Sequence, residues 1–163
     1  MIHLNPAPTG HFMLRFSKMA DYGVLLLSHW TRNENALVSA RELADLYHMP
    51  QSLAANLLKT FCKSGLLESQ RGLHGGYRLT QPPSNITLLD IVGAIDGPVQ
   101  LTDCVLEAES DITCDYLDVC SCHSPLHTIN EQICDYLRSL SLNDLSQNLP
   151  AVPSPATSEP HSL

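Results

Sequence analysis

The sequence lacks a long apolar run, a secretion signal and the common catalytic motifs. Its longest continuous apolar stretch, at residues 24–27, is four residues long, whereas a membrane-spanning helix needs about 18. Residues 1–12 have neither the basic start nor the apolar core of a secretion signal. A Gly-x-Ser-x-Gly turn and a phosphate-binding loop are also absent. We therefore expect a cytoplasmic protein with no membrane partner and no enzymatic activity.

Basic residues are scarce, and nearly all of them lie in the first half of the chain. The 163 residues carry a net charge of −8. Residues 13–83 hold eight Lys and Arg against five Asp and Glu, a net charge of +3. From residue 84 onward Arg138 stands against twelve acidic residues, a net charge of −11. This asymmetry predicts one surface that meets phosphate and another that does not.

Paired Cys-x2-Cys knuckles, which are typical of structural zinc, are absent although the chain has six cysteines. Thiols stay reduced in the cytoplasm, so we expect no disulfides. Four thiols lie within nineteen positions beside His123, at Cys104, Cys114, Cys120 and Cys122. The Cys-x9-Cys-x5-Cys spacing favours an iron–sulfur cluster held by thiolates. Two alternatives stay open: a zinc ion bound by three cysteines and His123, and reduced thiols without a ligand.

Residues 49–83 predict a helix followed by a β-hairpin. Apolar residues recur on one face of the helix, at Leu53, Leu57, Leu58 and Phe61. Polar and basic residues form the opposite face, at Ser52, Asn56, Lys59 and Lys63. Gly65 is expected to end the helix, and two short strands then flank a glycine turn. The pattern is typical of a winged helix–turn–helix DNA reader, and the alternative is an α+β fragment whose charges are only solvated.

Three shorter helical segments surround or follow this stretch. The first spans residues 16–30, with a buried stripe expected at Met19, Tyr22, Leu26 and Trp30. The second follows a capping box formed by Ser39 and Glu42 and runs to about Tyr47. The third opens at Thr87, which again resembles a cap, and ends at Gly97.

A long helix is predicted near the C-terminus, with Ser124 as its N-cap and Pro125 at its first position. It carries an apolar stripe at Leu126, Ile129, Ile133, Tyr136, Leu137 and Leu140. We interpret it as a dimerisation helix, because the remaining chain is too short to cover the whole stripe. The alternative is that the stripe packs on its own winged unit.

These patterns predict a mainly α protein with a small β-wing (α+β). Residues 1–12 are a flexible arm or a mis-assigned start, and residues 13–97 form the winged helix–turn–helix unit. Residues 98–124 form a cysteine-rich loop, and residues 125–147 the dimerisation helix. Residues 148–163 hold four prolines and little apolar content, so we expect a disordered tail.

Three stretches together resemble a known family. They are residues 13–22 (Met-Leu-Arg-Phe-Ser-Lys-Met-Ala-Asp-Tyr), 64–72 (Ser-Gly-Leu-Leu-Glu-Ser-Gln-Arg-Gly) and 75–79 (Gly-Gly-Tyr-Arg-Leu). They are similar to the bacterial winged-helix iron–sulfur repressors, and the resemblance covers residues 13–147. It implies a homodimer that binds a double-stranded DNA operator and represses iron–sulfur cluster assembly (SUF) genes. A repressor that senses nitric oxide or redox state, and a zinc-dependent winged-helix repressor, are the alternatives.

The resemblance also implies a ligand set. Cys104, Cys114 and Cys120 would be the cluster thiolates, with His123 as the fourth ligand and Cys122 or Asp21 as alternatives to it. The second gap between the thiols matches the family pattern, and the first gap of nine is longer. Both [2Fe–2S] and [4Fe–4S] clusters remain open. The residues expected to contact bases or the DNA backbone are Gln51, Ser52, Asn56, Lys59, Lys63 and the wing-tip residue Arg71.

Overall fold

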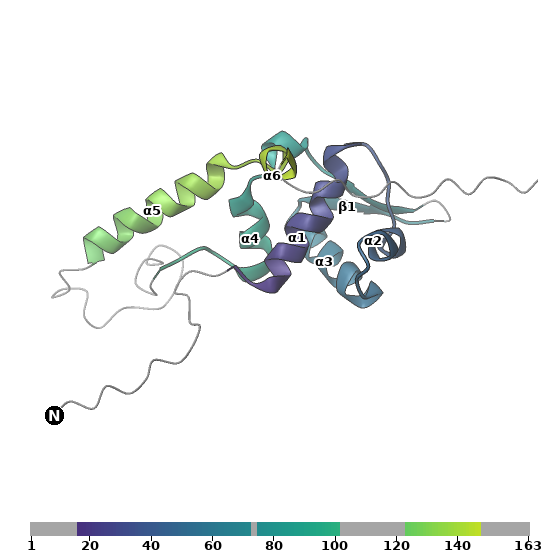
Figure 1. The fold of residues 1–163 in the computed structure, drawn as a ribbon, viewed down its shortest axis with the longest axis horizontal. Helices are drawn as coiled ribbons and strands as arrows, with labels where there is room; N and C mark the ends of the chain where they lie inside the picture. The colour runs from purple at the N-terminus through teal and green to yellow at the C-terminus, as the bar shows by residue number, and fades with distance from the viewer. Residues whose placement is uncertain (1–15, 73–74, 102–122, 148–163) are drawn as a thin grey trace, which may run out of the picture.

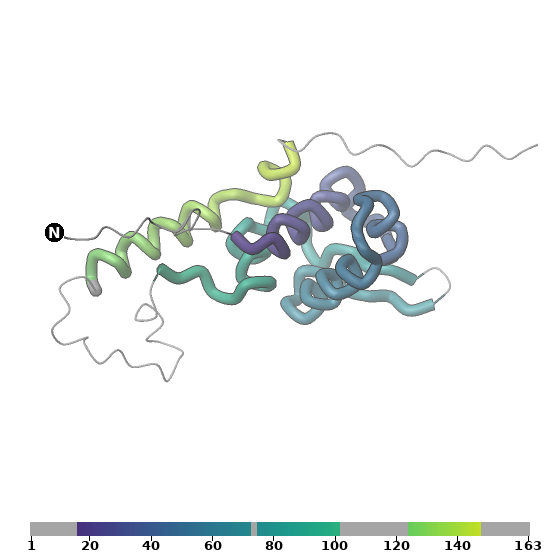
Figure 2. Tube along the Cα trace, turned by 60° about the horizontal axis from the view of Figure 1, so that its bottom comes forward, coloured from purple at the N-terminus to yellow at the C-terminus, as the bar shows by residue number. Residues whose placement is uncertain are grey.

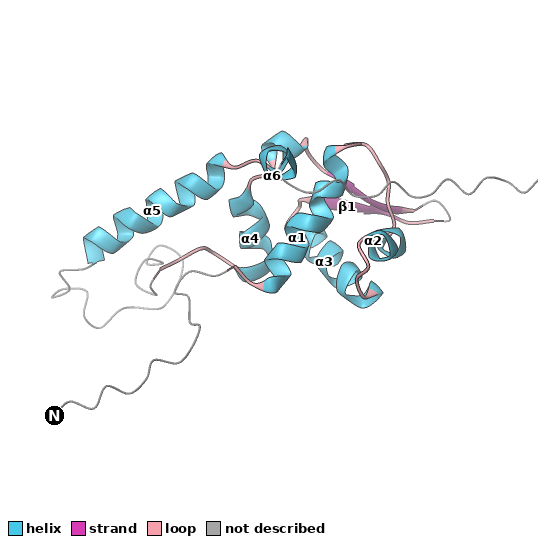
Figure 3. Cartoon of the chain, in the orientation of Figure 1, coloured by secondary structure: helices cyan, strands magenta, loops and turns pink. Residues whose placement is uncertain are grey.

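The computed structural model describes residues 16–72, 75–101 and 123–147. The predictions for residues 1–12, most of the cysteine-rich segment and the tail lie outside these residues. The elements in chain order are α1 (Lys18–Leu27), η1 (Ser28–Thr31), α2 (Ala40–Leu46), α3 (Gln51–Lys63), β1 (Leu67–Gln70), β2 (Gly76–Leu79), η2 (Pro83–Asn85), α4 (Leu88–Asp96), α5 (His123–Ser139) and α6 (Leu142–Gln147). The structure confirms the predicted class, a mostly helical protein with a two-stranded antiparallel wing (Figures 1 and 3).

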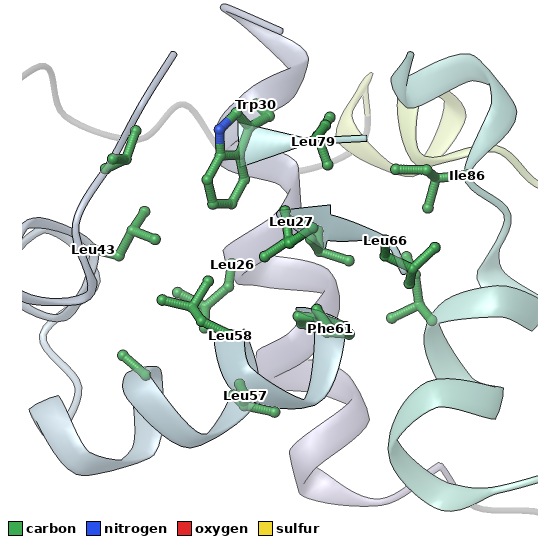
Figure 4. Close-up of a cluster of buried hydrophobic side chains, with 14 of the residues drawn as sticks. Leu26, Leu27, Trp30, Leu43, Leu57, Leu58, Phe61, Leu66, Leu79 and Ile86 are labelled. Carbon is green, nitrogen blue, oxygen red and sulfur yellow. The ribbon is translucent and has the colours of Figure 1, made fainter. Parts of the chain in front are cut away.

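The main core lies where α1, α2 and α3 meet the wing (Figure 4). The predicted inner face of α3 is confirmed, because Leu57, Leu58 and Phe61 are buried there and Leu53 is partly buried against the same core. Leu26 and Trp30 of the first predicted stripe are buried as well. Met19 does not fit that prediction, since 37% of it is exposed at the end of α1 that lies away from this core.

Capping boxes fix the starts of two helices, as the sequence predicted. At α2 the Ser39 N–H donates to Glu42 Oε2 over 2.7 Å, and the Glu42 N–H donates to Ser39 Oγ over 3.2 Å. Thr87 and Asp90 make the same reciprocal pair at α4. The hydrogen bonds from the Ser39 backbone and hydroxyl lower the pKa of Glu42. The stabilisation by this cap is therefore present above the usual carboxyl pKa and is lost as the pH falls.

The wing is held against the body by a third stretch of extended chain. In the hairpin Leu67 pairs with Leu79 and Gln70 pairs with Gly76. Val38, which precedes α2, forms an isolated antiparallel bridge with Tyr77, with N···O distances of 3.0 and 2.8 Å. Gly76 permits this approach, because a Cβ there would lie 2.8 Å from the Val38 carbonyl carbon. The wing is therefore fixed relative to the start of α2.

The C-terminal helices return to the same body. Leu142 of α6 is completely buried in the main core. The Leu88 N–H donates to the Leu140 carbonyl over 2.9 Å, and the Leu142 N–H donates to the Ile86 carbonyl over 2.7 Å. A second apolar cluster, formed with Ala20, Val92 and Leu137, packs α1, α4 and α5 together. The division of the chain at residue 97 stays a prediction.

One expectation for the long helix needs correction. The helix begins at His123, so Ser124 lies inside it and is not its N-cap. The apolar stripe is divided between two roles: Leu137 is buried, whereas 45% of Ile129 and 66% of Tyr136 are exposed. One side of α5 thus packs on its own body, and the other side leaves large apolar side chains uncovered among the described residues.

We expect Gly23→Ala to destabilise the junction of α1, α3 and α4. A Cβ at Gly23 would lie 2.4 Å from Ile95 Cδ1 and 2.9 Å from the ring of Phe61. The Ile95 methyl can turn away, but the Phe61 ring is fully enclosed. Overpacking costs about 1–3 kcal/mol and replacing a helical glycine by alanine gains about 1 kcal/mol, so we expect a net loss of up to about 2 kcal/mol. Urea denaturation monitored by circular dichroism measures the loss.

Gly93→Ala is the matched control, because Gly93 also lies in a helix and a Cβ there meets nothing within 4 Å. It should raise the free energy of unfolding by up to about 1 kcal/mol. Equal effects of the two substitutions would contradict the close packing at Gly23.

Candidate nucleic-acid interface

The outer face of α3 presents every helix residue that the sequence assigned to DNA contact. The helix starts after Pro50 and ends before Gly65, whose φ of +80° lies in the left-handed region. Its inner face is anchored in the core. All five predicted contact residues on the other side are exposed: Gln51, Ser52, Asn56, Lys59 and Lys63. An anchored helix with a polar outer face can be presented to a groove of DNA without distorting its core.

A tight turn sets α3 across α2. His48 adopts a left-handed conformation with φ of +51°, which is uncommon for a non-glycine residue. The Met49 N–H donates to the Ala44 carbonyl over 3.0 Å and closes the turn. The two helices pack closely along their buried faces. This is the helix–turn–helix arrangement, in which the second helix is the recognition helix, or reading helix, that contacts the bases.

A groove of about 640 Å³ separates α3 from the wing. The second half of α3 forms one wall, the start of α2 contributes to it, and the wing forms the other side. The polar side chains in its lining include Ser39, Lys59, Lys63, Ser69, Gln70 and Arg71. The bridge between Val38 and Tyr77 keeps the α2 start and the wing together, so the groove depends on tertiary contacts and not on the hairpin alone.

The groove is cationic. Lys59, Lys63 and Arg71 contribute to its lining, and none of the described residues that line it is acidic. The other arginine of the wing, Arg78, forms an ion pair with Glu68 on the opposite strand, and both side chains are about half exposed. Arg78 is therefore largely neutralised, and the positive potential of this face is concentrated at the groove.

Cys62 lies in the groove wall as well as at the edge of the core. The side chain is half-buried, and burial raises the pKa of the Cys62 thiol. It is consequently a protonated, weakly reactive thiol at neutral pH.

The structure brings together three of the six predicted contact residues in the groove, namely Lys59, Lys63 and Arg71. Gln51, Ser52 and Asn56 lie outside the groove on the exposed side of α3. Sequence reasoning missed Ser39, Ser69 and Gln70 as groove residues. Ser39 was recognisable only as a helix cap, and Ser69 and Gln70 carry no signal beyond their place in a strand.

The predicted metal ligands are not tested by the structure. Cys104, Cys114, Cys120 and Cys122 lie outside the described residues, and only the backbone of His123 is described. Asp21 is exposed in the first turn of α1. Within residues 16–72, 75–101 and 123–147, no three Cys, His, Asp or Glu side chains come together as a metal site.

An amphipathic helix set across a second helix, with a wing bridged beside it and a cationic groove between them, defines a winged helix–turn–helix DNA-binding protein. Across the described part of the chain, no helix is both long and apolar enough to cross a membrane. The Rrf2 family, described as "Iron-dependent Transcriptional regulator", matches residues 16–148. The chain belongs to this family of transcriptional regulators.

Individual relatives agree with this assignment. The chain is 27% identical over 139 residues to protein aau3 of Rhizobium meliloti, a match that covers 85% of this chain and 89% of the relative. It is 26% identical over 136 residues to the HTH-type transcriptional regulator IscR of Xenorhabdus nematophila, covering 83% of this chain and 80% of that protein.

Solved structures show the same fold. CymR, the global cysteine regulator of B. subtilis, superposes with a TM-score of 0.64 and 21% identity, covering 84% of this chain and 99% of that one. T. potens IscR superposes with a TM-score of 0.59 and 23% identity, covering 83% and 88% of the two chains. At these identities the likeness establishes the fold alone.

Proposed function

We propose that this protein is a dimeric, cytoplasmic repressor whose affinity for an operator depends on an iron–sulfur cluster. The observation that carries the DNA-binding part is the cationic groove between α3 and the wing, together with the exposed outer face of α3. A phosphate backbone fits beside such a groove, while Gln51, Ser52 and Asn56 reach base edges. The proposed targets are iron–sulfur cluster assembly (SUF) genes.

Dimerisation through α5 is the second part of the proposal. Ile129 and Tyr136 lie two turns apart and are the large exposed apolar side chains of this helix. A second copy of α5 would bury both. Two reading helices could then address two half-sites about 34 Å apart, one turn of B-DNA.

Cluster binding is the third part of the proposal. The donor set that we assign is Cys104, Cys114, Cys120 and His123, with Cys122 or Asp21 as alternative fourth ligands. Three thiolates within one short segment suit the chemistry of iron–sulfur ligation, and the family description is iron-dependent. A bound cluster would supply a redox- and ligand-sensitive group. A ligand other than a thiolate would make its loss easier, as a sensor requires.

We expect Cys120→Ala to abolish stoichiometric iron and sulfide binding and the brown colour of anaerobically purified protein, because it removes a thiolate ligand. Metal analysis and visible absorption spectroscopy measure this. Cys62→Ala is the control, since Cys62 lies on α3 and its loss should leave the spectrum unchanged. An unchanged spectrum in Cys120→Ala would exclude this cysteine as a ligand.

The same measurements decide between the alternatives. A colourless protein with one zinc per chain would point to zinc held by three cysteines and His123. Bleaching of the cluster by nitric oxide or by oxidant, with loss of operator binding, would identify the signal as nitric oxide or redox state instead of cluster supply.

A further inference from the structure

Asn130 of α5 is one of two buried polar residues among those that the structure describes, and only 7% of it is exposed. The other is Ser28, whose hydroxyl makes a local bond within its own turn. A buried amide is retained only where its hydrogen bonds are satisfied, because leaving them unmade is costly. The hydrogen-bond partners of Asn130 therefore indicate the role of this residue.

The Asn130 side-chain amide forms hydrogen bonds with the chain segment that follows α4. The Leu101 N–H donates to Asn130 Oδ1 over 2.9 Å, and Asn130 Nδ2 donates to the Val99 carbonyl over 3.4 Å. The Cys134 thiol, one turn further along α5, also approaches the Val99 carbonyl at 3.6 Å. Both ends of one side-chain amide thus engage the backbone on either side of Gln100.

This contact joins segments that are distant in sequence. The segment after α4 runs back along the side of α5 in both views (Figures 1 and 2). It is the last described stretch before residue 102. The N-terminal end of α5 projects away from the winged body (Figure 2).

Two ties of different kinds thus hold α5 to the winged body. At its C-terminal end, backbone bonds connect Leu88 with Leu140 and Ile86 with Leu142. The apolar contacts of Val92 and Leu137 lie between the ties. Toward its N-terminal end the tie is made by two side chains, the amide of Asn130 and the thiol of Cys134, which both contact residues 99–101. The tie at the C-terminal end joins backbone groups, whereas the tie at Asn130 depends on side chains and can open without unfolding a helix.

We propose that Asn130 is a positioning residue for operator binding: its amide sets the orientation of α5 relative to the winged unit by locking residues 99–101 against the helix. The inference rests on the proposed function, because it concerns how two winged units are spaced in the dimer. Displacement of the chain at Leu101 opens the amide tie, α5 pivots about its backbone tie, and the two reading helices lose their register on the operator.

The substitution Asn130→Asp tests this with little change in shape. The carboxylate keeps an acceptor for the Leu101 N–H. It places a second oxygen against the Val99 carbonyl, so the contact with Val99 becomes repulsive. Gln132→Asp is the matched control, since it adds the same charge two residues along the same helix at an exposed position. Asn130→Leu removes both bonds without a charge and decides the question if the Asp variant does not fold.

Hydrogen exchange followed by mass spectrometry is the first measurement on the full chain. Opening of the tie should increase exchange in the peptide that contains Leu101 by about tenfold in Asn130→Asp and leave Gln132→Asp at the wild-type rate. Unchanged exchange at Leu101 in both Asn130 variants would overturn the tie.

Operator binding is the second measurement, on duplex DNA selected from a random pool by the wild-type protein. Asn130→Asp should bind the complete two-half-site operator about tenfold more weakly and a single half-site within about twofold of wild type. Equal losses on both duplexes, or none, would overturn the positioning role. A wild-type protein that selects no DNA would instead overturn the proposed function, a result distinct from either.

Discussion

The double variant Lys59→Ala/Arg71→Ala should bind a duplex with one operator half-site about 100-fold more weakly at 0.1 M salt, because each lost cation removes a backbone contact of roughly 1–2 kcal/mol. One of these cations comes from α3 and the other from the wing, and both line the groove. On this duplex the slope of log affinity against log salt should become shallower by about 2, since each phosphate contact contributes roughly 0.9. Fluorescence anisotropy titrations at several salt concentrations measure both quantities.

The charge-matched control for this variant is Lys18→Ala/Arg138→Ala. It removes the same two charges from α1 and α5, and neither residue lines the groove. If binding depended only on the net charge of the molecule, the two double variants would lose the same affinity. Binding that depends on the groove would leave the control near the wild-type affinity and slope. Equal losses would thus remove the groove from the DNA-binding surface.

Phe61→Ala should lower the free energy of unfolding by about 3–5 kcal/mol, the range for removing a buried aromatic side chain. Phe61 is fully buried where α3 meets α1, and its ring lies against Gly23. Urea denaturation of the purified protein measures the change.

Asn56→Ala is the counterpart to Phe61→Ala on the same helix. Asn56 is exposed, so its loss should leave stability within about 0.5 kcal/mol of wild type. It should nevertheless weaken discrimination between operator sequences if the side chain reads a base edge. A stability loss at Asn56 equal to that at Phe61 would contradict the division of α3 into an inner and an outer face.

Local patterns were sufficient to predict the reading unit. The helical spacing of Leu57, Leu58 and Phe61 identified the buried face of α3, and the exposed face followed from it. The caps at Ser39 and Thr87 were also predictable, because their hydrogen bonds join residues three apart. In these cases the deciding interactions are local, and the chain adds tertiary packing that agrees with them.

The contacts that assemble the groove and orient α5 were not predictable. The bridge of Val38 to Tyr77 and the capture of Leu101 by Asn130 join residues far apart in sequence. Neither leaves a periodic trace, since one involves backbone groups and the other a single asparagine in a polar stretch of helix. The predicted start of α5 was also wrong. Ser124 and Pro125 form a good local cap signal, yet the helix begins at His123.

The burial of Leu142 restricts how the molecule can be cut into working pieces. This side chain comes from the last described helix, yet it completes the same core as Leu26 and Phe61. A fragment that stops after α4 would keep every DNA-facing residue and still have a hole beneath the 3₁₀ turns η1 and η2, against which α6 packs. An excised DNA reader therefore has to carry residues 140–147 with it, either on the same polypeptide or added back as a peptide.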